Sequence, residues 1–178
     1  DYFIMSAGTG GTLTGVARAL KEKIPGVKVI GVDPHGSILA QPSSLNGAVS
    51  SYQVEGIGYD FIPRVLDRTL CDEWIKTSDK ESFVMARRLI REEGLLAGGS
   101  SGATMWAAVK FCKDNNLGPD KRVVVLLADS VRNYMTKHLS EEWMKDNDFM
   151  ASDEKNSEAL WWHSHTVGNL SLVSPTCV

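Results

Sequence analysis

The sequence predicts an α/β fold, a three-layer sandwich in which a mostly parallel sheet lies between layers of helices. Short apolar runs alternate along the chain with longer segments of helical periodicity, as a series of βαβ units requires. The run at residues 122–127 is apolar at nearly every position, which is typical of a parallel strand covered on both faces. A hydrophobic fraction of 43% and a charged fraction of 23% are ordinary for a globular domain.

The first half of the chain contains three predicted strands and one helix. The first strand covers residues 2–5, and a helix over residues 12–23 ends before a Pro-Gly pair, which breaks helices. The second strand covers residues 27–32. Residues 36–51 are rich in turn-forming residues and predict a long connection. We expect a further short strand at residues 65–70.

The second half begins with a helix start signal. Residues 78–81 read S-D-K-E, a capping box, and the helix behind it ends at Gly94. This helix carries one apolar face, made of Phe83, Ala86, Leu89 and Ile90. The next helix covers residues 103–115, and its apolar face is made of Met105, Ala108, Val109 and Cys112. After the strand at residues 122–127, Ser140 opens a last helix that runs through Met144.

Charge and residue usage exclude several classes of function. The net charge of −3 argues against a general nucleic-acid surface, and no apolar run approaches the roughly 18 residues of a membrane span. Cys71, Cys112 and Cys177 form no C-x-x-C pair, so neither a structural zinc site nor a disulfide framework is expected. His163 and His165 stand beside two tryptophans without further ligands nearby, and no metal site is predicted.

The loop after the first strand has the chemistry of a phosphate site. Glycines let the backbone approach a ligand closely, and successive N–H groups then converge into an anion nest. The N-terminus of the following helix adds free donors and partial positive charge, and threonine hydroxyls add further donors. The candidate phosphate ligands are Gly8, Thr9, Gly10, Gly11 and Thr12.

Two other interpretations of this loop remain open. A Rossmann dinucleotide site has the pattern G-x-G-x-x-G and an acidic residue after the second strand. Gly8, Gly10 and the strand-ending Asp33 fit, but Leu13 stands at the third glycine position and Pro34 follows the acid. The second alternative is a strand-to-helix turn without a ligand. The composition G-T-G-G-T favours the phosphate site over both.

Five segments together resemble a known family. In chain order they read S-A-G-T-G-G-T, G-V-D-P, E-G-I-G-Y-D-F-I-P, E-E-G-L-L-x-G-G-S-S-G and D-S-V-R-N-Y-M. This combination is similar to the cystathionine β-synthase family, which belongs to the fold-type-II pyridoxal-phosphate enzymes together with cysteine synthases and serine/threonine dehydratases. The likeness runs from residue 1 to about residue 149. It implies the tryptophan-synthase-β-like architecture of fold type II and pyridoxal 5′-phosphate as the cofactor, its phosphate bound by residues 8–12.

The resemblance also implies a role for Ser100, whose hydroxyl would meet the pyridine nitrogen of the cofactor. A neutral hydroxyl does not hold a proton on that nitrogen as an aspartate would, so the ring is a weaker electron sink. This favours loss of a β-substituent over transamination. From the residues alone, the alternative is that Ser100 is the N-cap of the following helix, and a cap position is compatible with the cofactor role.

Two more segments receive roles from the resemblance. The substrate-side loop is made of Gly56, Ile57, Gly58 and Tyr59. Tyr59 is there to contact substrate or cover the site, and the alternative is an aromatic residue that only packs the loop. Asp129 follows the last strand and would lie near the cofactor ring, although Ala128 stands where relatives usually carry proline.

One element of the family pattern is missing from the chain. Enzymes of this family hold the cofactor as a Schiff base on a lysine in the N-terminal half, and none of the eleven lysines here stands in that context. We therefore interpret residues 1–149 as the C-terminal part of a catalytic core and residues 150–178 as a linker or tail with a Trp-Trp-His patch at residues 161–163. We expect no catalytic residue in this chain, which by itself should be inactive. The alternative is a natural short protein.

The expected activity of the longer protein is the condensation of L-serine with L-homocysteine to cystathionine, a step of transsulfuration and cysteine biosynthesis. The alternatives are a cysteine synthase that uses O-acetylserine, and a non-catalytic fragment that binds a phosphate or a partner. The resemblance implies a cytoplasmic homo-oligomer. Arg18 aligns with an arginine that approaches haem in animal members, so haem is implied for the longer protein only, through its N-terminal region.

Overall fold

The sheet of the protein is fully parallel. The computed structural model describes residues 1–150, and the Trp-Trp-His patch lies outside this part. Within it, four strands run in the order β3-β2-β1-β4, with every neighbouring pair parallel. The strands are β1 (Tyr2–Ser6), β2 (Lys28–Pro34), β3 (Glu73–Thr77) and β4 (Val123–Val125). The α-helices are α1 (Gly11–Lys23), α2 (Asp79–Glu93), α3 (Gly99–Asp114) and α4 (Glu141–Asp146).

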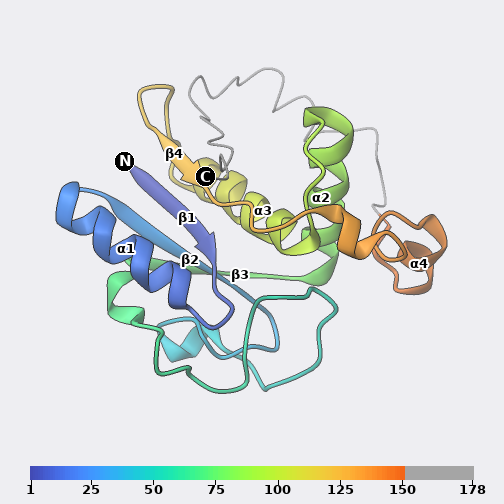
Figure 1. The fold of residues 1–178 in the computed structure, drawn as a ribbon, viewed down its shortest axis with the longest axis horizontal. Coiled ribbons are helices and arrows are strands. Elements are labelled where there is room, and N and C mark those ends of the chain that lie inside the picture. Colours follow the sequence, from blue (N-terminus) through green and yellow to red (C-terminus); the bar gives the residue numbers. More distant parts are fainter. Residues whose placement is uncertain (151–178) are drawn as a thin grey trace.

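Helices cover both faces of the sheet, as the predicted three-layer sandwich requires (Figure 1). The alternation of side chains along β1 divides the core between the two faces. Phe3 and Met5 belong to the cluster that contains Leu13 and Ala17 of α1. Ile4 belongs to the cluster on the opposite face, with α3 and, behind it, α2. Both faces of β1 are therefore buried, which explains its uninterrupted apolar sequence.

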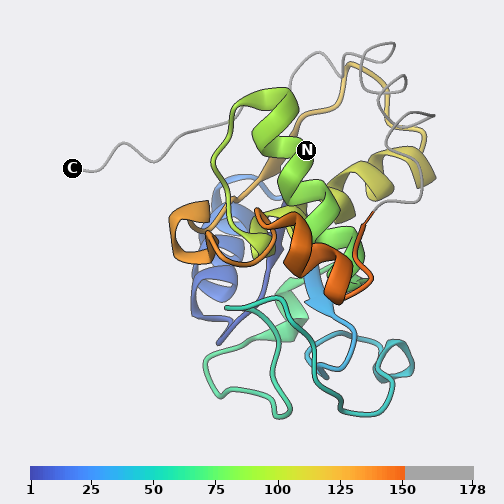
Figure 2. The same ribbon diagram turned by 90° about the vertical axis from the view of Figure 1, so that its right-hand side faces the viewer.

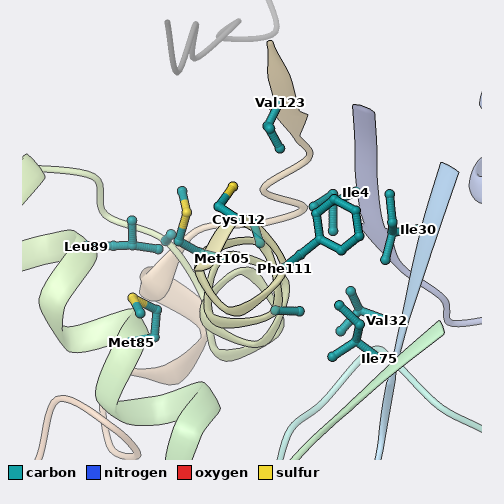
Figure 3. Close-up of a cluster of buried hydrophobic side chains, with 13 residues drawn as sticks. Ile4, Ile30, Val32, Ile75, Met85, Leu89, Met105, Phe111, Cys112 and Val123 are labelled. Atoms are coloured by element: carbon teal, nitrogen blue, oxygen red, sulfur yellow. The ribbon is translucent and has the colours of Figure 1, made fainter. Parts of the chain in front are cut away.

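Figure 3 shows the core on the α3 face of the sheet. Phe111 of α3 packs against branched side chains from three strands, which are Ile4, Ile30, Val32 and Ile75. Met85 and Leu89 of α2 pack on the other side of α3. The predicted capping box of α2 is present, since Ser78 Oγ accepts from the Glu81 N–H and the Glu81 carboxylate accepts from the Ser78 N–H.

A third cluster joins the end of the described chain to α2. Figure 2 shows residues 131–150, coloured orange to red, against α2. Phe83 of α2 lies at the centre of the cluster, with Trp143 of α4 edge-on at 5.1 Å and Phe149 at 5.4 Å between ring centroids. Ile57 belongs to the same cluster. Through this residue the last segment of the described chain packs beneath the loop of residues 56–59.

The strand predicted at residues 65–70 is wrong. Asp67 accepts hydrogen bonds from both the N–H (3.1 Å) and the hydroxyl (2.6 Å) of Thr69, and this local turn chemistry produces a 3-10 helix at Arg68–Leu70. The strand that pairs with β2 comes later, at Glu73–Thr77. There Trp74 and Ile75 are buried on opposite faces of the sheet.

Two predicted boundaries are also corrected. Helix α3 begins at Gly99 and not at residue 103, so residues 99–102 form the first turn of this helix. Strand β4 covers three residues of the six predicted, because it pairs only with the short start of β1. The expected boundary between a core at residues 1–149 and a tail at residues 150–178 stays a prediction.

Candidate functional site

A cavity of about 470 Å³ opens at the carboxyl end of β1, among the N-terminal turns of α1 and α3. This is the end of an open parallel sheet at which ligands bind. The lining residues come from four segments that are far apart in the sequence: Met5, Ser6, Gly8, Thr9, Gly10, Thr12, Leu13, Gly56, Ile57, Gly58, Tyr59, Ser100, Ala128 and Asp129. Of the residues predicted to form the site, only Gly11 does not line the cavity.

The backbone of residues 8–12, the predicted phosphate loop, is shaped by glycine at two positions. Gly10 is the N-cap of α1 at φ 82°, in the left-handed region, and no side chain caps the helix there. The first-turn N–H groups of α1 are thus left for a ligand. A Cβ on Gly10 would lie 2.5 Å from the Cδ1 atom of Leu66, and a Cβ on Gly8 would lie 2.5 Å from the carbonyl oxygen of Gly56. Gly11 contributes as the first residue of α1.

The two serines at the start of α3 face different partners. Ser100 lines the cavity and is 4% exposed. The N-cap of α3 is Gly98, so the N-cap interpretation of Ser100 is wrong, and this residue is the second of the helix. Ser101 Oγ accepts a hydrogen bond from the Ala128 N–H at 3.1 Å. Ser101 thereby ties the segment after β4 to α3, while Ser100 is directed at the cavity.

Asp129 is held in place by its neighbours at the cavity wall. Its carbonyl oxygen accepts from the Gly98 N–H at 3.0 Å, and its Oδ2 accepts from the hydroxyl of Tyr134 at 2.5 Å. Burial raises the pKa of Tyr134 to about 12, and the hydrogen bond and negative charge of Asp129 act in the same direction. The phenol therefore stays a proton donor to Asp129 at neutral pH. Sequence reasoning missed Tyr134, although it follows Asp129 by only five residues.

Asp33 does not belong to the cavity. Its side chain is fully buried, and Oδ2 accepts from Lys76 Nζ at 2.7 Å and from the Ala40 N–H at 3.2 Å. In a dinucleotide site the equivalent acid would be turned to the ribose hydroxyls. The geometry of Asp33 therefore speaks against the Rossmann alternative.

Residues 1–150 lack two further kinds of feature, a metal centre and a membrane-spanning helix. In this part of the chain no group of three or more His, Cys, Asp or Glu side chains is arranged to hold a metal ion. No helix within the same residues has the length and apolar character needed to cross a membrane. None of the described residues that line the cavity is a lysine.

Comparison with known proteins places the chain in a family. The model of the pyridoxal-phosphate dependent enzyme family matches residues 1–129. The chain belongs to this family. Relatives in the pyridoxal-phosphate dependent enzyme family include cystathionine β-synthase of Dictyostelium discoideum, which is 57% identical over 100% of this chain and 36% of its own length. Cystathionine β-synthase of Oryctolagus cuniculus is 54% identical over 100% of this chain and 32% of its own length.

A solved structure gives the same assignment for the fold. The crystal structure of O-acetylserine dependent cystathionine β-synthase from Helicobacter pylori matches with a TM-score of 0.66 and 39% identity, over 76% of this chain and 42% of that one. The architecture is thus that of the fold-type-II pyridoxal-phosphate enzymes. The chain spans about a third of the length of the two curated relatives above.

Proposed function

We propose that the protein is a pyridoxal-phosphate-dependent β-replacement enzyme that condenses L-serine with L-homocysteine to give cystathionine. The observation that carries the proposal is the convergence of the G-T-G-G-T loop, the loop of residues 56–59 and Ser100 on one cavity at the carboxyl end of the sheet. The names of relatives that match the whole chain support the same activity.

The residues present fit the cofactor of this family. The uncapped first turn of α1 and the hydroxyls of Thr9 and Thr12 offer neutral donors to a phosphate group, so no cationic side chain is needed there. Pyridoxal phosphate, when bound, supplies an electron sink for the α-carbon of an amino acid. Ser100 would face the pyridine nitrogen and leave it unprotonated, because a neutral hydroxyl does not stabilise the protonated nitrogen as a carboxylate does. Asp129 and Tyr59 would form the walls on either side.

The attachment of the cofactor is proposed to involve a part of the protein outside residues 1–178. The family uses a lysine for this attachment, and no described lysine lines the cavity. The oligomeric state, a cytoplasmic location and a haem group in the longer protein are proposals of the same standing. Arg18, which the resemblance links to haem, lies 3.9 Å from Asp67 in the described part and is largely exposed.

A second candidate function is a synthase that takes O-acetylserine in place of serine. The Helicobacter pylori protein, which shares the fold at 39% identity, is named as O-acetylserine dependent. Turnover with homocysteine separates the two activities, because the first forms cystathionine from serine with release of water and the second forms it from O-acetylserine with release of acetate.

The experiment that tests the proposal is removal of the Thr12 hydroxyl in the full-length protein. Thr12→Ala should weaken the binding of pyridoxal phosphate by ~1.5–3 kcal/mol, the contribution of a hydrogen bond to a charged group. Affinity is measured by titrating the cofactor-free protein. Thr69→Ala is the matched control, because it also removes a hydrogen-bonding hydroxyl but lies outside the cavity. Equal affinities for the Thr12→Ala variant and the parent would exclude this loop as the phosphate site.

A further inference from the structure

We propose that Ser37 is a positioning residue that fixes Tyr59 in the cavity wall and thereby sets the binding of the amino-acid substrate. What Tyr59 meets in the cavity rests on the proposed function. How Tyr59 is held does not, because it follows from contacts among residues of the loop after β2 and the loop of residues 56–59. Neither the resemblance nor the sequence pattern pointed to Ser37.

The hydroxyl of Ser37 engages both backbone polar groups of Tyr59. Ser37 Oγ accepts from the Tyr59 N–H at 2.9 Å and donates to the Tyr59 carbonyl oxygen at 3.0 Å. The Ile38 N–H donates to the same carbonyl at 3.0 Å. Ser37 is 1% exposed, so these hydrogen bonds are made away from solvent and their loss would leave the Tyr59 N–H without its acceptor.

Gly58 lets the two segments approach closely enough for this contact. Its φ is +79°, and a Cβ at this position would lie 2.5 Å from the Tyr52 hydroxyl and 2.9 Å from the Ser37 Cβ. The Gly58 N–H donates to the Ala7 carbonyl at 2.8 Å, at the exit of β1. The backbone next to Tyr59 is therefore fixed on one side by Ser37 and on the other by the start of the phosphate loop.

The position of Ser37 is itself fixed by a buried ion pair. Lys76 Nζ lies 2.7 Å from Asp33 Oδ2, and the exposed fractions of the two side chains are 7% and 0%. Lys76 Nζ also donates to the Ser37 carbonyl oxygen at 2.9 Å. Asp33 and Lys76 face each other in the register of β2 and β3. Breaking a buried ion pair is costly because it leaves an uncompensated charge. The Asp33–Lys76 pair therefore holds Lys76, and through it the Ser37 backbone, in place.

A change at Ser37 should act on one wall of the cavity and not on the predicted phosphate donors. Tyr59 and its neighbour Ile57 line the cavity, whereas the phosphate donors belong to the separate loop at the N-terminus of α1. A shift of Tyr59 changes the wall of the cavity and leaves the first turn of α1 in place. Loss of the Ser37 hydroxyl should therefore weaken substrate binding more than cofactor binding.

Ser37→Ala in the full-length protein tests the inference with two independent measurements. Hydrogen exchange of the Tyr59 amide should become about tenfold faster or more, because the amide loses its acceptor. The KM for the amino-acid substrate should rise by about fivefold or more, with kcat and pyridoxal phosphate affinity changed less than about twofold. Ser82→Ala is the matched control, since Ser82 is also fully buried and its hydroxyl donates to a backbone carbonyl, that of Ser78, away from the cavity.

The outcomes separate the inference from the proposed function. Unchanged exchange at Tyr59, or an equal change in Ser82→Ala, overturns the positioning by Ser37. Faster exchange with an unchanged KM overturns the link to substrate binding. Absence of cofactor binding in the unsubstituted protein overturns the proposed function, while the exchange measurement still decides how Tyr59 is held. If Ser37→Ala does not fold, Ser37→Cys, which keeps a weak donor and acceptor, should accelerate exchange in the same direction.

Discussion

Ser100 and Ser101 differ in what a substitution should do, although they are adjacent in the sequence. The hydroxyl of Ser101 already accepts a hydrogen bond from the Ala128 N–H, so its partner lies within the protein. Ser100 lines the cavity, where a change of its chemistry would act on a bound ligand. With Ser100 beside the pyridine nitrogen, as proposed, a carboxylate at this position would hold a proton on that nitrogen and strengthen the electron sink of the cofactor.

Ser100→Asp is therefore expected to lower β-replacement activity and to raise the side reaction of transamination. Formation of pyridoxamine phosphate during turnover with serine measures the side reaction. Ser100→Ala, which removes the hydroxyl without adding charge, should not produce the pyridoxamine form. Normal synthase activity of Ser100→Asp without any pyridoxamine form would show that the side chain does not meet that nitrogen.

His138 is a buried titratable residue outside the cavity. Its ring stacks on Phe83 at 5.6 Å and lies 6.0 Å from Tyr134 between centroids. Burial lowers the pKa of His138 below its usual 6.5, and the Ala97 carbonyl and the Asp129 carboxylate only partly oppose this. The folded protein thus holds a neutral imidazole among aromatic rings.

His138→Phe is expected to remove a pH dependence of stability. Between the lowered pKa of the folded state and 6.5, the unfolded state binds more protons, so the free energy of unfolding falls as the pH falls through this interval. The melting temperature of His138→Phe should therefore rise relative to the unsubstituted protein as the pH is lowered from 7 to 5. A difference that stays constant over this range would falsify the assignment. His35→Phe, at an exposed position, is the control.

At the residue scale, composition and the family resemblance were sufficient to find most of the cavity. They found the glycine loop, the loop of residues 56–59, Ser100 and Asp129 because these segments carry unusual local patterns. Ser37 and Lys76 were missed, because each acts through a partner that lies far along the chain, 22 residues away for Tyr59 and 43 for Asp33. The Asp33–Lys76 contact follows from the pairing of β2 with β3, and the Ser37–Tyr59 contact from the packing of two loops. A linear pattern shows neither.

Among the elements of residues 1–150, α2 and α3 share the most extensive contact, and glycine permits it. A Cβ on Gly102 of α3 would overlap the carbonyl oxygen of Ser82 and lie 2.7 Å from the Ala86 nitrogen, both of them backbone atoms of α2. These atoms cannot move aside without separating the helices. Because Ser100 and Ser101 lie in the same first turn of α3 as Gly102, the fit at Gly102 also sets the cavity end of α3.

Gly102→Ala should destabilise the protein by about 1–3 kcal/mol, the usual cost of overpacking, in spite of the better helix propensity of alanine. Gly15→Ala offers a direct comparison, because Gly15 lies inside α1 with nothing within 4 Å of an added Cβ. It should gain up to ~1 kcal/mol. Urea unfolding of the two variants measures both values, and equal effects would contradict the packing argument.

Elements were predictable where the hydrophobic period was clear. The first two strands and the first two helices were placed with small shifts at their ends. The strand Glu73–Thr77 was missed because Lys76 interrupts its apolar pattern, and only the buried partner Asp33 explains a lysine there. The run at residues 65–70 was mistaken for a strand because Asp67 acts through a local hydrogen bond to Thr69 that overrides the apolar spacing.

On the scale of the whole molecule, the cavity combines segments from nearly the entire described chain. No described lysine reaches it, and covalent capture of an aldehyde needs an amine placed at that atom. The chain covers 36% and 32% of the two cystathionine β-synthases above. The architecture was predictable from the alternation of strands and helices, whereas the source of the amine lies outside what these residues determine.

The chain of residues 1–178, expressed by itself, is therefore expected to form no cystathionine from serine and homocysteine. Added pyridoxal phosphate should modify lysines at random, because no lysine among residues 1–150 lines the cavity. Borohydride reduction followed by peptide mapping distinguishes random from specific attachment. Stoichiometric modification of one lysine, together with turnover, would overturn this prediction and the proposed need for residues outside the chain.

Strand β4 gives the protein an order of assembly during synthesis. It pairs with β1, and the Arg122 N–H donates to the carboxylate of Asp1 across 121 residues of sequence. A nascent chain therefore carries its glycine loop out of the ribosome on the order of 10 seconds before Ala128 and Asp129 follow, at typical rates of translation. Until then the ligand-binding end of the sheet lacks a wall. Completion of the cavity is thus a late event in synthesis, because Ala128 and Asp129 are the last of its lining residues to be made.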